Sequence, residues 1–281
     1  MQTIYPIRGA FWKQDRMGRI LNAAVQRAEL DLAWSCLAER ACDLAIERFA
    51  DTIHSVYLCG PAARNRPGGA SFAIVLRPAA DENGADSWAQ AAAAELRREA
   101  PHNQSANVTV LGWRDLFMQR GRHSPALFRL SVNSICVGGR NLKPMIPAPK
   151  LTEAVANTSI VALETRLLRA KAKTMTANTR RRVRAISAQV GHDVISAGYA
   201  TIMAGEQLYS EDLDMRRDLF ALHYPELKNE IQRAYDMAAL PTGDPVPLRT
   251  FINDTLKWMT PITSAWLNTY NPQREEVLAQ G

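Results

Sequence analysis

The sequence predicts an α+β fold in two parts, a mixed-sheet core over residues 1–148 and an all-helical domain over residues 151–281. Short apolar runs alternate with stretches of helical periodicity in the first half, whereas the apolar patterns of the second half all have helical spacing. Pro144, Pro147 and Pro149 interrupt the chain between these halves. Because proline removes a backbone donor and restricts φ, we place the domain boundary there.

The first half contains a helix before the first strand and further helices between the later strands. Apolar residues at helical spacing over 17–50 predict one long helix or two broken ones. Strands are predicted at 55–59, 71–77 and 108–111, and a closing strand, glycine turn and leucine at 136–142. Further helices are predicted from Ser87, which can cap a helix, to Glu99, at 113–120 and at 127–134. This order predicts a small mixed sheet with helices outside it.

The second half predicts a bundle of long helices. They are expected at 152–173, 179–205, 210–223, 225–239 and 247–270. The strongest pattern lies in 179–205, where the apolar stripe consists of Val183, Ile186, Val190, Val194, Ile195 and Tyr199.

Composition narrows the functional classes. The hydrophobic share of 47% supports a substantial core, and the formal charge of +6 suits anionic ligands but is low for a dedicated nucleic-acid binder. The four cysteines have no Cys-x-x-Cys spacing, so no zinc site is expected. The start of the sequence lacks the pattern of a signal peptide, and no run of ~18 apolar residues predicts a membrane span. We therefore expect a cytoplasmic protein with no membrane contact.

Residues 54–76 carry the most informative motif. Val56 to Leu58 form an apolar strand, Gly60 and the pair Ala63-Arg64 lie in the following turn, and Phe72 to Leu76 form a second strand. This motif resembles the first strand, glycine turn and second strand of the nucleotidyltransferase superfamily. With a helix before it and a helical bundle after it, the chain is similar in architecture to bacterial small-molecule nucleotidyltransferases.

The same resemblance shows which residues are missing. Members of that superfamily have Gly-Ser in the turn, Ser-Asp-x-Asp at the start of the second strand, and a third carboxylate on a later strand. Here Pro61 replaces the serine, Ser71 and Ala73 replace the aspartates, and Asn107 occupies the expected third position. Two-metal transfer requires carboxylates that hold Mg2+, so we expect no metal site and no cofactor.

Several residues are candidates for binding an anion. In the family that the chain resembles, the turn with Gly60, Arg64 and Arg66 faces the triphosphate, and Asn107 lies beside it. Arg180 and Arg184 share one face of a predicted helix in the densest basic cluster. Guanidinium groups bind phosphate through paired hydrogen bonds, although solvated loop and helix arginines are the alternative interpretation. Aromatic residues do not interleave with the cluster, so nucleic acid is not expected as a partner.

Three residues are candidates for catalysis. Ser71 is the replaced position that keeps a reactive group, and it would need a base such as His102 or His123. In the relatives that the chain resembles, the helical domain lines the acceptor side, which makes His192 and Tyr199 candidates for acid–base chemistry. The structural alternatives are a strand serine with a backbone partner and a surface histidine on a helix.

These observations predict a degenerate nucleotidyltransferase-fold protein that binds a small anionic or nucleotide-like ligand in the cleft between its domains, without two-metal catalysis. Such a pseudoenzyme would act as a binding or regulatory subunit and could work as a homodimer. One alternative is a metal-independent enzyme that acts on a small metabolite through His192 or Tyr199. Another is an active nucleotidyltransferase with relocated carboxylates, drawn from Glu206, Glu211, Asp212 and Asp214.

Overall fold

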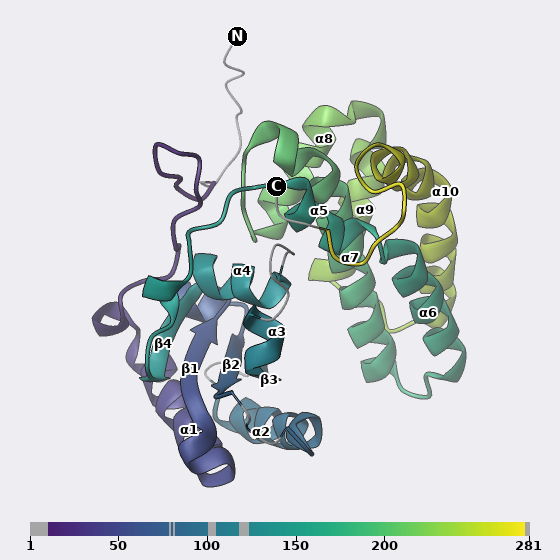
Figure 1. Cartoon of the computed structure of the whole chain (residues 1–281). Helices are drawn as coiled ribbons and strands as arrows, with labels where there is room; N and C mark the ends of the chain where they lie inside the picture. Colours follow the sequence, from purple (N-terminus) through teal and green to yellow (C-terminus); the bar gives the residue numbers. More distant parts are fainter. Residues whose placement is uncertain (1–10, 79, 81, 101–104, 118–123, 279–281) are drawn as a thin grey trace. The chain divides into compact units, whose positions relative to one another are not determined.

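The computed structural model describes residues 11–78, 80, 82–100, 105–117 and 124–278. Over these residues the chain is α+β, with a four-stranded mixed sheet and helices in both halves (Figure 1). It divides into two compact units. One consists of residues 13–150, and the other consists of the residues from Leu151 onward with the segment that ends at Trp12.

The sheet lies in the unit of residues 13–150 and has the strand order β3-β2-β1-β4. Its strands are β1 (Ile53–Cys59), β2 (Ala70–Leu76), β3 (Ala106–Leu111) and β4 (Ser134–Gly139). Strand β1 is antiparallel to both β2 and β4, whereas β2 and β3 are parallel. The predicted mixed sheet is confirmed, and β3 and β4 each begin two residues earlier than the apolar pattern predicted.

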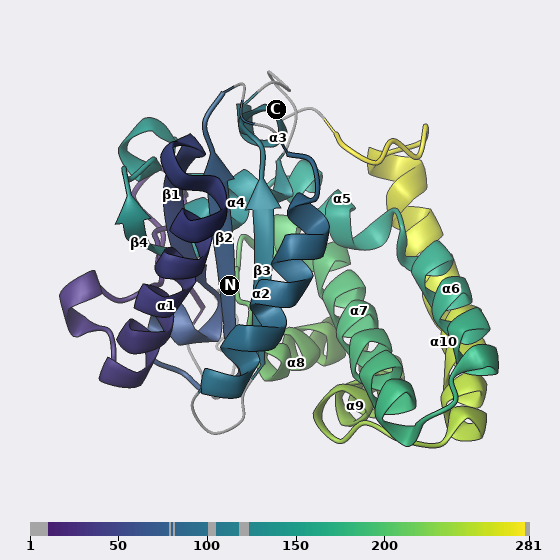
Figure 2. The ribbon, with the colours of Figure 1, turned by 90° about the horizontal axis from the view of Figure 1, so that it is seen from below.

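Helices cover both faces of this sheet. Helices α1 (Leu32–Phe49) and α2 (Ala85–Glu99) lie side by side on one face (Figure 2), over a core that includes Leu58 and Phe72. Helices α3 (Trp113–Phe117) and α4 (Pro125–Val132) pack on the opposite face, over Tyr57 and Val75. Successive side chains of a strand point to opposite faces, so β1 and β2 contribute to both cores.

The prediction of helix over residues 17–50 is wrong for the first half of this segment, because α1 begins at Leu32. Asp15 accepts hydrogen bonds through Oδ1 from the N–H groups of Met17 (2.8 Å) and Arg19 (2.9 Å), and Gly18 has a φ of +73°. The Ile20 N–H then donates to Pro149 O at 2.8 Å. A side-chain-capped turn and a long-range bond therefore replace the helical hydrogen bonds that the apolar spacing favoured.

The other unit is built around helix α7, which contacts α5, α6, α8, α9 and α10. Its helices are α5 (Glu153–Ile160), α6 (Leu163–Thr176), α7 (Arg180–Glu206), α8 (Leu213–His223), α9 (Lys228–Ala239) and α10 (Pro245–Tyr270). The apolar stripe predicted for residues 179–205 is largely buried, which explains the central position of α7. Within the described part of the chain, no helix combines the length and apolar character needed to cross a membrane.

The single helix predicted over residues 152–173 is two helices, α5 and α6. Arg166, from the first turns of α6, donates through Nη2 to Ser159 O at 2.5 Å and through Nη1 to Thr158 O at 3.5 Å. These carbonyl groups lie in the last turn of α5. The arginine thus satisfies carbonyl acceptors at the end of α5 that a continuous helix would have satisfied itself.

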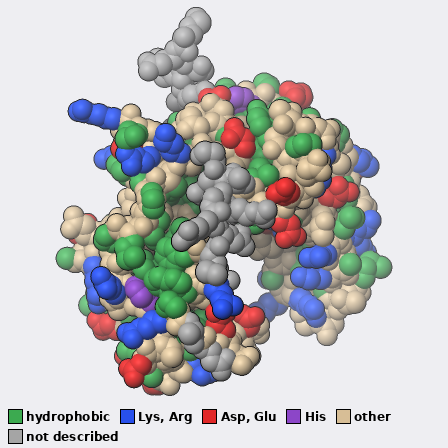
Figure 3. All heavy atoms as spheres, in the orientation of Figure 1, with side chains coloured by type: hydrophobic (Ala, Val, Ile, Leu, Met, Phe, Trp, Pro, Cys, Tyr) green, Lys and Arg blue, Asp and Glu red, His purple; other side chains and the backbone are tan. Residues whose placement is uncertain are grey.

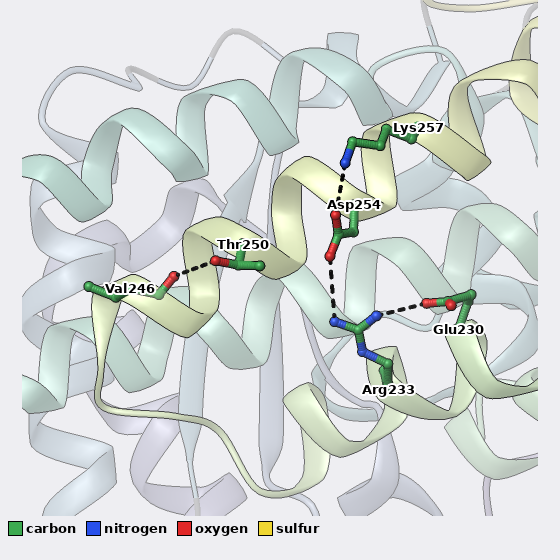
Figure 4. A network of polar contacts seen from close by, with 6 residues as sticks. All are labelled: Glu230, Arg233, Val246, Thr250, Asp254 and Lys257. Carbon is green, nitrogen blue, oxygen red and sulfur yellow. Dashed lines mark hydrogen bonds and ion pairs between the residues drawn. The ribbon is translucent and has the colours of Figure 1, made fainter.

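Helices α9 and α10 are joined by a polar network at their surface (Figure 4). Arg233 of α9 forms ion pairs with Glu230 at 3.0 Å and with Asp254 of α10 at 3.8 Å, and Lys257 reaches Asp254 at 3.1 Å. These groups are partly exposed, so each pair contributes at most about 1 kcal/mol. The network links α9 and α10 at the surface, while each of these helices packs on α7.

Trp12 belongs to the helical unit, although the sequence-based division assigned all of residues 1–148 to the first domain. The Trp12 N–H donates to Tyr209 O at 2.9 Å, and its ring meets that of Tyr209 edge to face at 4.8 Å. A buried aromatic pair of this kind is formed by residues far apart in the sequence, so no local pattern could predict it.

Candidate functional site

The positions expected to hold metal-binding carboxylates lie on one face of the sheet. Ser71 on β2 pairs in register with Asn107 on β3, and Ala73 lies two residues further along β2, so its side chain is on the same face. Ser71 is half-buried and Asn107 is exposed. The structure thus brings these three residues together, and none of them carries a carboxylate.

The register extends this face into a row across all four strands. Ser71 pairs with Cys59 on β1, and Cys59 pairs with Ser134 on β4. We refer to Asn107, Ser71, Cys59 and Ser134 as the cross-strand row. Its side chains offer an amide, two hydroxyl groups and a thiol. The Ser134 hydroxyl donates to Leu130 O at 2.6 Å, so this member of the row is engaged in the fold.

Lys143 lies at the β4 end of the row and was not identified from the sequence. It begins a short 3-10 helix, η5 (Lys143–Met145), and its Nζ donates to Ser134 O. The side chain is half-buried, and burial lowers the pKa of the Lys143 amine to about 8. In the sequence, its position directly after Leu142 gives little indication that the amine is half-buried, since a lysine after a glycine turn is ordinarily at the surface.

Tyr57 fixes the backbone next to Lys143. Its hydroxyl accepts the N–H of Leu142 at 2.5 Å and donates to Asn141 Oδ1 at 3.2 Å. Asn141 Oδ1 also accepts the Lys143 N–H at 3.0 Å. Burial raises the pKa of Tyr57 to about 12, so the phenol remains neutral and serves as a hydrogen-bonding anchor.

The turn between β1 and β2 uses most of its own amide groups. It starts at Gly60, with a φ of +79°, and continues as the 3-10 helix η3 (Pro61–Arg64). Four N–H groups of the turn donate to carbonyl oxygens of the same turn. The Ala62 N–H donates to Gly69 O, the Ala63 N–H to Gly60 O, the Asn65 N–H to Ala62 O and the Arg66 N–H to Pro61 O. An anion at this turn would therefore meet the side chains of Arg64, half-buried, and Arg66, exposed, rather than a cradle of free amides.

His192 lies at the surface of α7, beside a polar pair. Its Nδ1 is 3.5 Å from Ser196 Oγ, and Ser196 Oγ accepts a hydrogen bond from Arg216 Nη1 at 2.8 Å. His192 is exposed, whereas Ser196 is buried. This arrangement brings His192, one of the catalytic candidates, close to the Ser196 hydroxyl.

Tyr199 is in the core of the helical unit, with 1% of its surface exposed. Its hydroxyl donates to Leu208 O at 2.5 Å and accepts the Ser210 N–H at 3.0 Å. Burial raises the pKa of Tyr199 to about 12. A buried, doubly bonded phenol has no room for a substrate, so its geometry indicates a structural role, holding the segment that follows α7.

Arg180 and Arg184 line a pocket of about 500 Å³ in the helical unit. The wall facing them is the loop of Thr242, Gly243 and Asp244, which leads into α10. Neither arginine forms an ion pair with any residue that the structure describes. Figure 3 shows Lys and Arg side chains gathered on the helical unit over α6 and α7.

Two helices begin at this pocket. Thr179 caps α7, its hydroxyl accepting the Arg182 N–H at 3.2 Å, and Asp244 caps α10, its carboxylate accepting the Val246 N–H at 2.8 Å. The N-terminal end of a helix carries partial positive charge. A Cβ atom on Gly243 would be 3.3 Å from Arg180 Cβ and 3.4 Å from Arg184 Nε, so the loop packs closely against both arginine side chains.

The acidic residues proposed as relocated metal ligands do not form a group that could hold a metal ion. Glu206 pairs with His223 at 2.9 Å, Glu211 accepts the Tyr209 hydroxyl at 3.4 Å, and Asp212 is at the N-cap of α8. Among the described residues, no three His, Cys, Asp or Glu side chains are grouped so that they could hold a metal ion. His102 and His123, the candidate bases for Ser71, lie outside the described residues.

The described residues thus offer two polar regions with different chemistry. The arginine pocket can bind an anion, and the cross-strand row with Lys143 gathers amide, hydroxyl, thiol and amine groups in a partly buried setting. No protein-family model matches the chain, and no curated protein matches it.

Proposed function

We propose that this protein is a degenerate nucleotidyltransferase-fold protein that binds a small anionic or nucleotide-like ligand without two-metal catalysis. The observation that carries the proposal is the pocket of about 500 Å³ lined by Arg180 and Arg184. This volume lies in the range of small-molecule sites. The charge and geometry of the pocket support an anionic ligand.

The pocket has the properties that phosphate recognition requires. Arg180 and Arg184 lie one helical turn apart, so both guanidinium groups face the same space. The starts of α7 and α10 add the positive ends of two long helices. Asp244 supplies the one carboxylate of the lining, and one of its oxygens is engaged in capping α10. The net charge of the pocket lining therefore remains positive, which favours binding of an anion.

The sheet supports the second part of the proposal, the absence of two-metal chemistry. Ser71, Ala73 and Asn107 share one face but provide no anionic ligand for Mg2+. Binding at the arginine pocket is thus expected to be independent of the metal. EDTA should leave the affinity for pyrophosphate or ATP unchanged.

A calorimetric titration with pyrophosphate and with ATP tests this function. Arg180→Gln/Arg184→Gln removes both pocket arginines. The matched control, Arg181→Gln/Arg182→Gln, removes the same charge from exposed neighbours on the same helix that do not line the pocket. Losing two charge-assisted hydrogen bonds should weaken binding at least about tenfold in the first variant. The control should change affinity about threefold or less, as expected of screened surface charges.

Two results would argue against the proposal. If both double variants weaken binding equally, the basic surface rather than the pocket attracts the anion. If binding of ATP by the unmodified chain requires Mg2+, the protein has a metal site, and the alternative of an active nucleotidyltransferase with relocated carboxylates is favoured.

A further inference from the structure

Three large hydrophobic side chains lie beside the arginine pocket and are directed to solvent. Met175 is 72% exposed, Leu240 is 82% exposed and Val246 is 58% exposed. They are the three most exposed large hydrophobic side chains that the structure describes in the helical unit. Each is at most two positions in the sequence from a residue that lines the pocket. We refer to these three side chains as the rim of the pocket.

The rim comes from three elements that meet at one end of the helical bundle (Figure 2). Met175 is in the last turn of α6, Leu240 directly follows α9, and Val246 is in the first turn of α10. Helix α7 begins at the same end with Arg180. Single exposed hydrophobic residues are common on protein surfaces, whereas several around one polar pocket are typical of an interaction surface.

Positive charge is concentrated at this end of the bundle. The basic residues there are all exposed, and none forms an ion pair with a residue that the structure describes; they are Lys173, Arg180, Arg181, Arg182 and Arg184. Clusters of roughly four to eight lysines and arginines on a helical surface are typical of proteins that bind anionic lipids. The charge of this surface is therefore complementary to that of an anionic membrane.

A free phosphate compound would explain the arginines but not the rim. At a membrane surface the lipid phosphates lie at the depth of the basic side chains, and the acyl chains begin just below them. Apolar side chains that project beside the arginines would enter that layer. We infer that this end of the helical unit binds the surface of an anionic phospholipid membrane, with a headgroup phosphate in the arginine pocket and the rim inserted among the acyl chains.

This inference rests on the proposed anion-binding function and identifies the ligand as a lipid headgroup. The contact is peripheral. It differs from the sequence-based expectation of no membrane contact, which depended on the lack of a signal peptide and of a spanning segment. A protein partner fits this surface less well, because the core of a protein interface is a closely packed apolar patch, whereas the rim consists of separate side chains around a polar pocket.

Co-sedimentation of the full chain with vesicles tests the inference. Vesicles of equal amounts of phosphatidylcholine and phosphatidylglycerol present anionic headgroups, and vesicles of phosphatidylcholine alone present a neutral surface. The protein should bind the anionic vesicles at least about tenfold more tightly, because several basic groups act together. Pyrophosphate should compete with the anionic vesicles for the unmodified chain. Equal binding to both kinds of vesicle, or anionic vesicles that pyrophosphate does not displace, would overturn the inference.

A triple variant, Met175→Ser/Leu240→Ser/Val246→Ser, removes the rim and keeps every arginine. Loss of the inserted side chains should weaken binding to the anionic vesicles at least about tenfold. The affinity for pyrophosphate in solution should stay within about twofold, because none of the three residues lines the pocket.

The matched control removes three hydrophobic side chains of similar exposure from the other unit. Its changes are Leu32→Ser, Ile46→Ser and Met145→Ser, at positions that are 79%, 58% and 62% exposed. Vesicle binding by this control should change about twofold or less, because exposed side chains away from the contact contribute little. If the rim variant and the control bind vesicles equally, the rim does not insert, and the inference is wrong.

The remaining outcomes separate this inference from the proposed function. A chain that binds pyrophosphate but not anionic vesicles would keep the anion pocket and exclude the lipid, whereas a chain that binds neither would contradict both. Sedimentation velocity without vesicles examines the rim further. If the rim variant converts a dimer of the unmodified chain to a monomer, the rim contacts a second copy of the chain, and the membrane assignment is overturned.

Discussion

Tyr199 and Lys143 illustrate how burial shifts the pKa of a polar side chain in the direction that disfavours its charged form. Both pKa values are shifted mainly by loss of water. The hydroxyl of Tyr199 is fully engaged by Leu208 and Ser210, which leaves nothing for a substrate. Lys143 is half-buried, and its Nζ donates to one backbone carbonyl, that of Ser134. A shifted pKa therefore indicates function only together with access.

We expect Tyr199→Phe to lower the free energy of unfolding by about 1–3 kcal/mol, because a buried N–H group at Ser210 and a carbonyl at Leu208 lose their partner. Urea denaturation measures the difference. Tyr235→Phe is the matched control: Tyr235 is half-buried on α9, and its hydroxyl forms no hydrogen bond with a described residue, so the change should be within about 0.5 kcal/mol.

If Tyr199→Phe keeps full stability, the proposed structural role is wrong. Ligand binding gives the complementary result. Retained affinity in this variant would support the structural role, whereas lost affinity in a chain of unchanged stability would return Tyr199 to the candidate site.

At the scale of elements, the close approach of α7 and α9 depends on one glycine. A Cβ atom on Gly191 would lie 2.4 Å from Ala234 O and 2.5 Å from Ala238 N, both backbone atoms of α9. Backbone atoms cannot rotate away as a side chain can, so the helices must separate to admit a methyl group. Gly191 therefore sets the distance between these helices.

Gly191→Ala should destabilise the helical unit by about 1–3 kcal/mol, the usual cost of overpacking, despite the better helix propensity of alanine. The control is Gly205→Ala on the same helix, where no atom lies within 4 Å of the new Cβ. That change should be neutral or stabilise by up to about 1 kcal/mol. Thermal unfolding of the two variants gives the comparison, and equal midpoints would show that α7 and α9 can separate at no cost.

At the scale of the whole molecule, the chain passes between its two units twice. It leaves the helical unit after Trp12 and returns to it at Leu151. The buried Trp12 ring packs on Tyr209, so a residue near the start of the sequence completes a core made from residues beyond 150. The stability of the helical unit should consequently depend on a segment that precedes the sheet.

Trp12→Ala should reduce hydrogen-exchange protection around Tyr209 and α8 and leave the protection of β1 and β2 nearly unchanged. Replacing a buried tryptophan by alanine lowers the free energy of unfolding by about 3–5 kcal/mol, which is large enough to be detected by hydrogen exchange. Trp34→Ala, which removes a buried ring from α1 in the other unit, should give the reverse pattern. An equal loss of protection in both units after either change would contradict the assignment of Trp12.

The amino-acid sequence by itself determined the α+β class, the type of most elements and the position of the break near residue 150. These properties follow from local periodicity and proline, which act over a few residues. It also identified Ser71, Ala73 and Asn107 as related positions, and the strand register brings them onto one face. Local spacing misassigned residues 17–31, because the turn at Asp15 and the bond from Ile20 to Pro149 outweigh helical propensity.

Only the tertiary structure decided which polar groups meet. Lys143 reaches Ser134 because an antiparallel register closes β4 against β1, and the pocket at Arg180 and Arg184 forms because a loop some sixty residues later packs on them. Periodicity reports which side of an element is buried, but not which other element buries it. That choice depends on the packing of residues distant in sequence, and the two candidate sites arise from it.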